Sequence, residues 1–149
     1  GQDGAGSVQQ TADGGYIIVG STMSFGAGNG NGDVYLVKTD SSGNEAWSKT
    51  FGGSDSEGGS SVWQTSDGGY IIVGGVTIEQ SGFIVSGDIY LVRTDSSGNE
   101  VWSQTFGSTG LDGGASVQQT ADGSYIITGH YGIAPPHGHS DVYLVKVRR

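Results

Sequence analysis

The chain has 149 residues, of which 15 are acidic and 6 are basic, so its formal net charge is −9. An acidic surface repels phosphate backbones and anionic lipid head groups, which argues against nucleic-acid binding and electrostatic attachment to membranes. The sequence has no cysteine and no apolar run near the length of a membrane-spanning helix. It therefore predicts neither disulfides nor membrane insertion.

One segment of the sequence occurs three times along the chain. It reads SVQQTADGGYIIVG at 7–20, SVWQTSDGGYIIVG at 61–74 and SVQQTADGSYIITG at 116–129. The copies begin at residues 7, 61 and 116. Repeats with this spacing are typical of stacked supersecondary units, each of which buries an apolar face against the next. We therefore expect a single repeat domain over 1–149, with units at about 1–53, 54–107 and 108–149.

Four short strands are predicted in the first unit, and their order recurs in the later units. They cover 7–11, 16–20, 33–38 and 46–51. The second and third strands are apolar on both faces and rich in β-branched residues, which is typical of strands buried between two layers. Short turns at 12–15 and 39–45 contain glycine and connect these strands into an antiparallel meander. No segment has apolar residues at helical spacing, so the protein is predicted to be all-β.

A four-stranded meander with two doubly apolar central strands is typical of a β-propeller blade. The pattern DGGYIIVG, DVYLVKTD and GNEAWSKTFGG resembles a glycine-rich β-propeller repeat family of secreted and surface-anchored microbial proteins. The resemblance covers essentially the whole chain. It implies a propeller and an extracellular or cell-surface location. It implies no activity, because the family has no shared catalytic motif.

The last unit departs from the pattern, since KVRR stands where the other units have a turn and a fourth strand. Three blades, the last one incomplete, are too few for a propeller, which closes with about four to eight. Either two chains associate head to tail into a six-bladed ring, or further blades of a longer chain complete it. The alternative fold is a β-trefoil, which also has three units of four strands.

Candidate binding residues concentrate where the units differ most. These are the connections at 21–32, 75–87 and 130–140, which in a propeller lie on one rim together with the connections between blades. All three histidines fall in the last of these connections. His137 and His139 are separated by one residue, so in an extended segment their side chains point to the same side, which suits a metal ion. Trp63 replaces a glutamine of the other units, so its indole is a candidate for stacking on a sugar. The ligand-binding candidates are Trp63, Phe83, Tyr131, His130, His137 and His139.

Acidic residues recur at two positions of each unit beside the same predicted rim. Carboxylate oxygens are the ligands that calcium prefers, so a calcium site is one interpretation. The other interpretation is that each carboxylate accepts hydrogen bonds from backbone amides of a turn. The metal candidates are Asp3, Glu57, Asp112, Asp33, Asp88 and Asp141.

These features favour a non-catalytic extracellular module for binding or surface assembly, which requires no cofactor and has a glycan or a surface protein as its partner. The alternative is a carbohydrate-binding lectin that uses the rim connections and Trp63. A propeller glycoside hydrolase ranks third, because no acid pair stands out from the repeat. The turn at 12–15 is loosely like the Asp-box of sialidases, but the chain has only Arg93, Arg148 and Arg149 to bind a substrate carboxylate.

Overall fold

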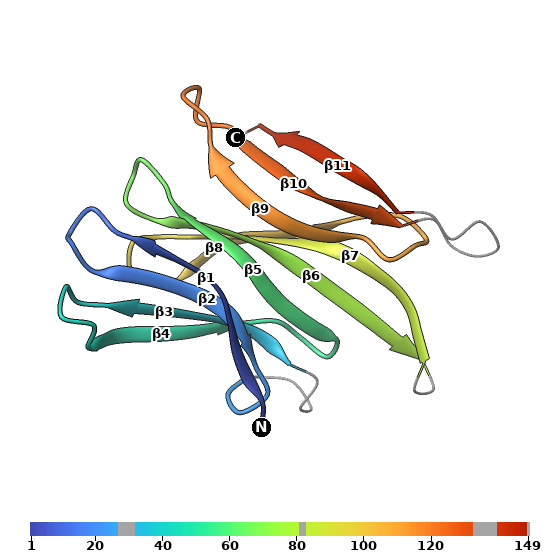
Figure 1. The fold of residues 1–149 in the computed structure, drawn as a ribbon, viewed down its shortest axis with the longest axis horizontal. Helices are drawn as coiled ribbons and strands as arrows, with labels where there is room; N and C mark the ends of the chain where they lie inside the picture. The colour runs from blue at the N-terminus through green and yellow to red at the C-terminus, as the bar shows by residue number, and fades with distance from the viewer. Residues whose placement is uncertain (27–31, 81–82, 133–139, 149) are drawn as a thin grey trace.

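The computed structural model describes residues 1–26, 32–80, 83–132 and 140–148 and shows three antiparallel sheets (Figure 1). Each sheet is a meander of consecutive strands, in the orders β1-β2-β3-β4, β5-β6-β7-β8 and β9-β10-β11. The strands are β1 (Asp3–Gln10), β2 (Tyr16–Thr22), β3 (Asp33–Thr39), β4 (Glu45–Phe51), β5 (Ser56–Gln64), β6 (Tyr70–Gln80), β7 (Phe83–Thr94), β8 (Glu100–Phe106), β9 (Gly113–Gln119), β10 (Tyr125–Gly132) and β11 (Ser140–Val147).

The turn between the first two strands of each sheet is built from the repeated Thr-x-Asp-Gly segment. In the first sheet Thr11 Oγ1 donates to Asp13 Oδ1 over 2.6 Å, and Gly15 N donates to the same oxygen over 3.0 Å. Gly14 has φ +84°, a left-handed conformation that favours glycine. The same bonds recur in the other two sheets, so this sequence specifies a tight hairpin wherever it occurs.

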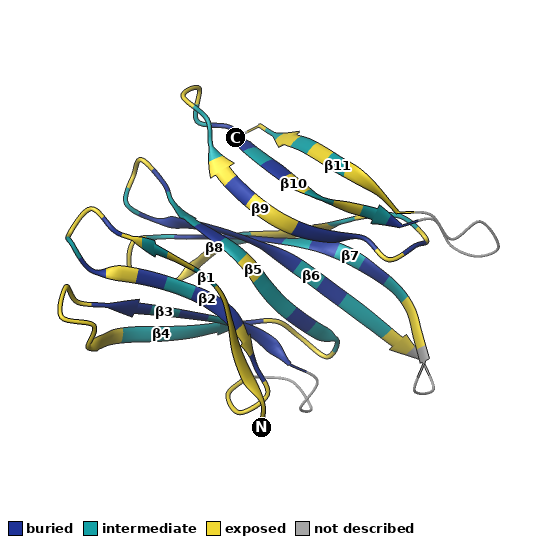
Figure 2. Cartoon of the chain, viewed as in Figure 1, coloured by how far each residue is buried: buried dark blue, intermediate teal, exposed yellow. Residues whose placement is uncertain are grey.

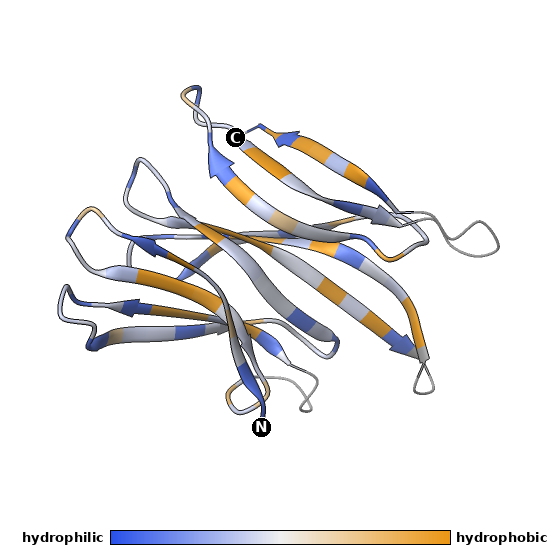
Figure 3. Ribbon diagram, viewed as in Figure 1, coloured by the Kyte–Doolittle hydropathy of each residue, from blue (hydrophilic) through white to orange (hydrophobic). Residues whose placement is uncertain are grey.

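The three sheets pack face to face in chain order, with two apolar cores between them. The first core lies between sheets one and two, and the second lies between sheets two and three (Figures 1 and 3). Strand β6 contributes to both, because Ile72 faces the first sheet and Ile71 faces the third. Figure 2 accordingly shows the middle strands of the central sheet as largely buried. Burial on both faces is what the doubly apolar repeat strands predicted.

The all-β class and the arrangement of four, four and three strands are confirmed among the described residues. The described strands form three separate sheets and no closed barrel. A β-trefoil is organised around such a barrel, so the described topology does not support that alternative. Closure of the sheets into a propeller is not part of the described structure.

The second variable connection differs from its prediction as a loop over 75–87. Strands β6 and β7 continue through most of it as a long hairpin, in which Val76 pairs with Asp88 and Ile78 pairs with Ser86. The physical reason is that β-branched residues at 76–78 and 84–85 favour the extended pleated backbone. The equivalent connections at 21–32 and 130–140 have their central residues outside the described part of the chain.

Candidate functional site

The acidic positions of neighbouring units meet at the boundary between sheets. Asp33 begins β3 and Glu57 lies near the start of β5, and the Glu57 N–H donates to the carbonyl of Gly32 over 2.9 Å. A side chain at Gly52 would collide with both Asp33 Oδ1 and Glu57 Oε2, so both carboxylates lie beside that glycine. Asp33 and Glu57 of neighbouring units thus lie close together at this sheet boundary.

The next sheet boundary repeats this arrangement with a second acidic pair. The Asp112 N–H donates to the carbonyl of Gly87 over 2.7 Å, and a side chain at Gly107 would collide with Asp88 Oδ1. Asp112 Oδ1 accepts the Gly132 N–H over 2.8 Å, and its other oxygen accepts the Ser108 N–H. Both sheet boundaries are thus joined by a carboxylate that holds the connecting backbone.

Burial dominates the electrostatics of the first pair. It raises the pKa of the Glu57 carboxyl, and the charges of Asp33 and Asp55 raise it further. Hydrogen bonding to the Gly53 amide acts in the opposite direction. Asp3, at the equivalent place in the first sheet, accepts hydrogen bonds from Thr22 Oγ1 and the Met23 amide, and these lower its pKa.

Asp3, Glu57 and Asp112 therefore accept hydrogen bonds from backbone amides, and Asp3 also accepts one from a hydroxyl. Within the described ranges, no group of three or more His, Asp or Glu side chains is arranged to hold a metal ion. Asp141 is exposed at the start of β11, at the far edge of the last sheet. Calcium binding at these positions stays a prediction.

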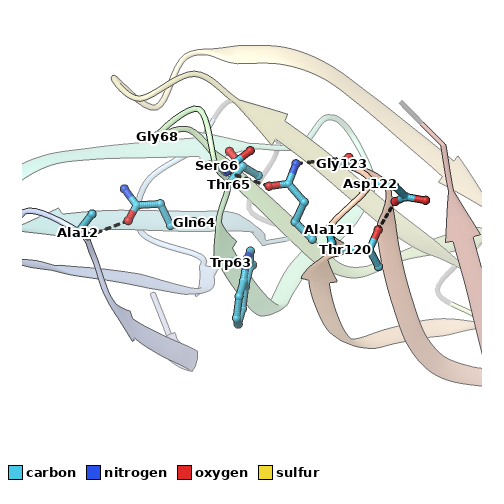
Figure 4. A pocket seen from close by; sticks show the side chains of 11 residues that line it. Ala12, Trp63, Gln64, Thr65, Ser66, Gly68, Thr120, Ala121, Asp122 and Gly123 are labelled. Carbon is cyan, nitrogen blue, oxygen red and sulfur yellow. Dashed lines mark hydrogen bonds between the residues drawn. The ribbon is translucent and has the colours of Figure 1, made fainter.

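Trp63 has two contacts that bear on its predicted role. Its half-buried indole packs against the core between sheets two and three. It also lines a shallow groove of about 700 Å³ over the turns of all three sheets (Figure 4). The groove is otherwise polar, with residues such as Gln64, Ser66 and Asp122 along it. An indole beside polar groups is a suitable surface for a sugar ring, although part of this one serves the core.

Glutamine side chains connect the turns beneath this groove. Gln64 Oε1 accepts the Ala12 N–H of the preceding sheet over 2.8 Å, and Gln119 Oε1 accepts the Ser66 N–H in the same way (Figure 4). These bonds between sheets were not predicted from the sequence. The signal was present, because a glutamine directly precedes the turn threonine in every unit.

The remaining ligand-binding candidates do not come together in the described structure. Tyr131 is half-buried and its ring stacks on Tyr143 at a centroid distance of 6.0 Å, so it helps to pack its own sheet. His130 is exposed, with its ring over Gly113. His137 and His139, and with them the predicted histidine metal site, lie outside the described residues. Phe83 begins β7, but its side chain also lies outside them.

The two outer faces of the stack are the surfaces that the predicted head-to-tail association would use, although their residues were not among the candidate site residues. Val8 is 62% exposed, whereas its equivalents Val62 and Val117 are buried. At the other end Val142 is 91% and Leu144 is 65% exposed. We call the outer side of the first sheet the head face (Val8, Tyr16 and Ile18) and that of the third the tail face (Ile126, Val142 and Leu144).

The equivalents of the tail-face residues are buried wherever a further sheet follows. Val34 and Leu36 in the first sheet, and Ile89 and Leu91 in the second, have no exposed surface. Figure 3 shows apolar bands along β11, and Figure 2 shows that strand mostly exposed. The repeat thus places core-forming residues on two surfaces that no described residue covers.

No model of a known protein family matches this chain, and no curated protein matches it. In the part of the chain that the structure describes, no helix has the length and hydropathy of a membrane span.

Proposed function

We propose that this protein is a non-catalytic extracellular module of the β-propeller type that assembles head to tail with a second copy of itself. The tail face of each copy packs on the head face of the other, and two chains complete a ring of six sheets. The extracellular location follows the glycine-rich propeller repeats that the sequence resembles. Such a ring would present its rim connections and groove to a glycan or a surface protein.

The observation that carries this proposal is the match between the two exposed faces and the two internal interfaces. Val62, Tyr70 and Ile72 cover the side of the first sheet that contains Leu36. Their head-face equivalents are Val8, Tyr16 and Ile18, and the tail-face equivalent of Leu36 is Leu144. The outer faces therefore have the composition of the two halves of an interface that occurs twice within the chain.

Polar groups at the two ends match in the same way. Each internal boundary has a glutamine oxygen that accepts a turn amide of the preceding sheet. In the first sheet the equivalent acceptor is Gln10 Oε1, and in the third the equivalent donor is the Ala121 N–H. Neither atom has a hydrogen-bond partner among the described residues. A head-to-tail contact would bring this pair together.

The test is the solution mass of the 149-residue chain by light scattering coupled to size exclusion. We expect a mass near twice 15.2 kDa. Leu144→Lys should weaken dimerisation at least about 10-fold, because it buries an unpaired charge at the interface. Leu144 is exposed in the single chain, so its replacement should leave the circular dichroism spectrum unchanged.

Two results would contradict the proposal. A monomer at all accessible concentrations would show that the exposed faces do not associate. A ladder of species larger than a dimer would show head-to-tail contact without closure into a six-sheet ring. Thr105→Lys is the matched control, because this exposed residue of β8 lies in the central sheet and belongs to neither outer face.

Carbohydrate binding in the groove is a second candidate, supported by the exposed part of Trp63 beside polar turns. The repeat itself supplies the test variant, since the other two units have glutamine there. If the groove binds sugar, the unmodified chain is retained by a glycan array and Trp63→Gln is not, while both remain folded. Absence of any retained glycan would contradict this function.

A further inference from the structure

Among the described strands, β11 has one neighbour in its sheet, whereas its equivalents β3 and β7 have two. Strand β3 pairs with β2 and β4, and β7 pairs with β6 and β8. Strand β11 pairs with β10, and no described strand lies along its other edge. An unpaired edge presents a row of backbone N–H and C=O groups that can template another strand.

The first two sheets show which sequence such an edge accepts. Strand β4 reads EAWSKTF and β8 reads EVWSQTF, so each has a tryptophan and a phenylalanine four residues apart. Residues separated by four point to the same face of a strand. Both aromatic side chains belong to the core that each of these sheets forms with the next sheet.

The strand register predicts where these aromatic residues would lie on β11. Phe106 pairs with Ile89 and Trp102 pairs with Arg93. The equivalent positions of β11 are Val142 and Lys146. Val142 is almost fully exposed, so an incoming phenylalanine would cover apolar surface that no described residue covers.

The neighbouring sheet shows a further role for the tryptophan. Trp47 lies edge-on to Tyr70 of the second sheet at 5.9 Å, and Trp102 lies at 6.2 Å from Tyr125 of the third. Tyr16 is the head-face equivalent of these tyrosines, and it is 37% exposed. A strand added to β11 would therefore give the tail face a tryptophan equivalent to Trp47 and Trp102 of the internal interfaces.

We propose that the outer edge of β11 is a binding site for an extended segment of another polypeptide with the pattern Trp-x-x-x-Phe. The segment binds antiparallel to β11 by strand addition, with its phenylalanine over Val142 and its tryptophan beside Lys146. Backbone hydrogen bonds provide part of the affinity, and the two aromatic side chains provide the specificity. The site does not depend on whether the chain also dimerises.

The test uses a fluorescein-labelled peptide with the sequence of residues 98–107, GNEVWSQTFG, titrated with the full chain. We expect saturable binding of one peptide per chain, measured by fluorescence anisotropy. A peptide with serine in place of both aromatic residues should bind at least about 10-fold more weakly. Hydrogen exchange should slow in 140–147 when the peptide is bound.

Variants of the chain separate this site from self-association. Val8→Lys blocks the head face, so peptide binding is compared in Val8→Lys and in the double variant with Val142→Lys. Both residues are exposed, and we expect the double variant to fold and to lose at least about 10-fold in peptide affinity. The mass of the chain without peptide reports self-association independently.

Three results would overturn the proposal. One is the absence of saturable binding. Another is equal affinity for the serine peptide or for the Val142→Lys double variant. The third is binding without slower exchange in 140–147, which would place the peptide elsewhere on the molecule.

Discussion

Glycine at one position of the repeat allows the first two strands of each sheet to approach closely. Gly74 of β6 faces the carbonyl of Gly58, and Gly20 and Gly129 face the equivalent carbonyls in the other sheets. Each contact lies next to an irregularity in the pairing of these strands. A Cβ at any of the three positions would overlap backbone atoms, which cannot move aside as a flexible side chain can.

We expect Gly74→Ala to destabilise the protein by about 2 kcal/mol or more, because it forces the backbones of β5 and β6 apart. The neighbouring Gly75→Ala is the matched control. A Cβ there would meet only the carbonyl of Asp88 at 3.6 Å, an ordinary contact. Urea unfolding at neutral pH measures both changes, and equal stability of the two variants would contradict the close-approach argument.

At the scale of elements, an ion pair connects the first turn of each sheet to its third strand. Asp13 pairs with Lys38 at 2.8 Å in the first sheet, and the hydrogen bond from this lysine is the largest cause that holds the pKa of Asp13 well below its usual range. The second sheet uses Arg93, whose guanidinium binds both oxygens of Asp67 and also donates to Tyr125 Oη of the next sheet over 3.0 Å.

Arginine therefore does more than lysine at this position. The guanidinium of Arg93 reaches across the boundary between sheets two and three, and the Arg93 side chain is almost fully buried. Lys146 in the third sheet pairs with Asp122 with both side chains partly exposed. Burial thus distinguishes two ion pairs that the aligned sequences present as equivalent.

We expect Asp67→Asn to destabilise the protein by about 2 kcal/mol at pH 7, because it leaves the buried Arg93 without its carboxylate. The more exposed pair offers a matched control, and Asp122→Asn should destabilise the protein less, because solvent screens that pair. Urea unfolding measures both, and equal losses would show that burial of the cation does not matter here.

The pH dependence of this loss follows from the sign of the pKa shift. Hydrogen bonding to Thr65 and the charge of Arg93 lower the pKa of Asp67 in the folded state. The ion pair therefore stabilises the fold fully at pH values above the pKa of Asp67 in the unfolded chain, which is about 4. This contribution is lost as the pH falls below that pKa. The difference in free energy of unfolding between the unmodified chain and Asp67→Asn should shrink as the pH falls below about 4. A difference independent of pH would contradict the role of the ion pair.

At the scale of the whole molecule, the stack has two different ends. The central sheet has a neighbour on both sides, whereas the head face and the tail face each lack one among the described residues. Two chains that associate head to tail form two equal contacts, and each contact uses one face of either kind. In a dimer held by two head faces, a substitution on the tail face would leave dimerisation unchanged. The reverse would hold for a dimer held by two tail faces.

We expect Val8→Glu alone and Leu144→Lys alone to be largely monomeric, and an equal mixture of the two to recover a mass near twice 15.2 kDa. The mixed dimer has one unmodified contact and one in which glutamate faces lysine, so opposite charges replace an unpaired one. Light scattering measures this recovery. Dimers of Val8→Glu alone would contradict head-to-tail contact, because the head face would then not be needed.

Much of this structure could be predicted from the repeats, since strand positions depend on local patterns. The apolar residues of 16–20 and the turn at 12–15 recur in every unit and form the same hairpin each time. The segment at 75–87 was predicted to be a loop because it differs from the other units. Its β-branched residues favoured strand, and pairing across the sheet extended β6 and β7 through it.

The candidate site was less predictable, because it depends on which residues of different units meet. The sequence indicated that Asp33 and Glu57 lie on one rim, but their positions around Gly52 are a property of the packed sheets. Trp63 was recognised as an exception to the repeat, and only the tertiary structure shows that it serves the core and the groove together. The histidine candidates at 137 and 139 lie outside the described residues.

The sequence by itself determined three repeated units and the antiparallel order of their strands. These follow from residue type and spacing, which act within one unit. The tertiary structure decided which equivalent residues are buried, because burial depends on a neighbouring sheet. Leu36, Leu91 and Leu144 occupy one position of the repeat, and only Leu144 is exposed, since no described sheet packs against the outer side of the third.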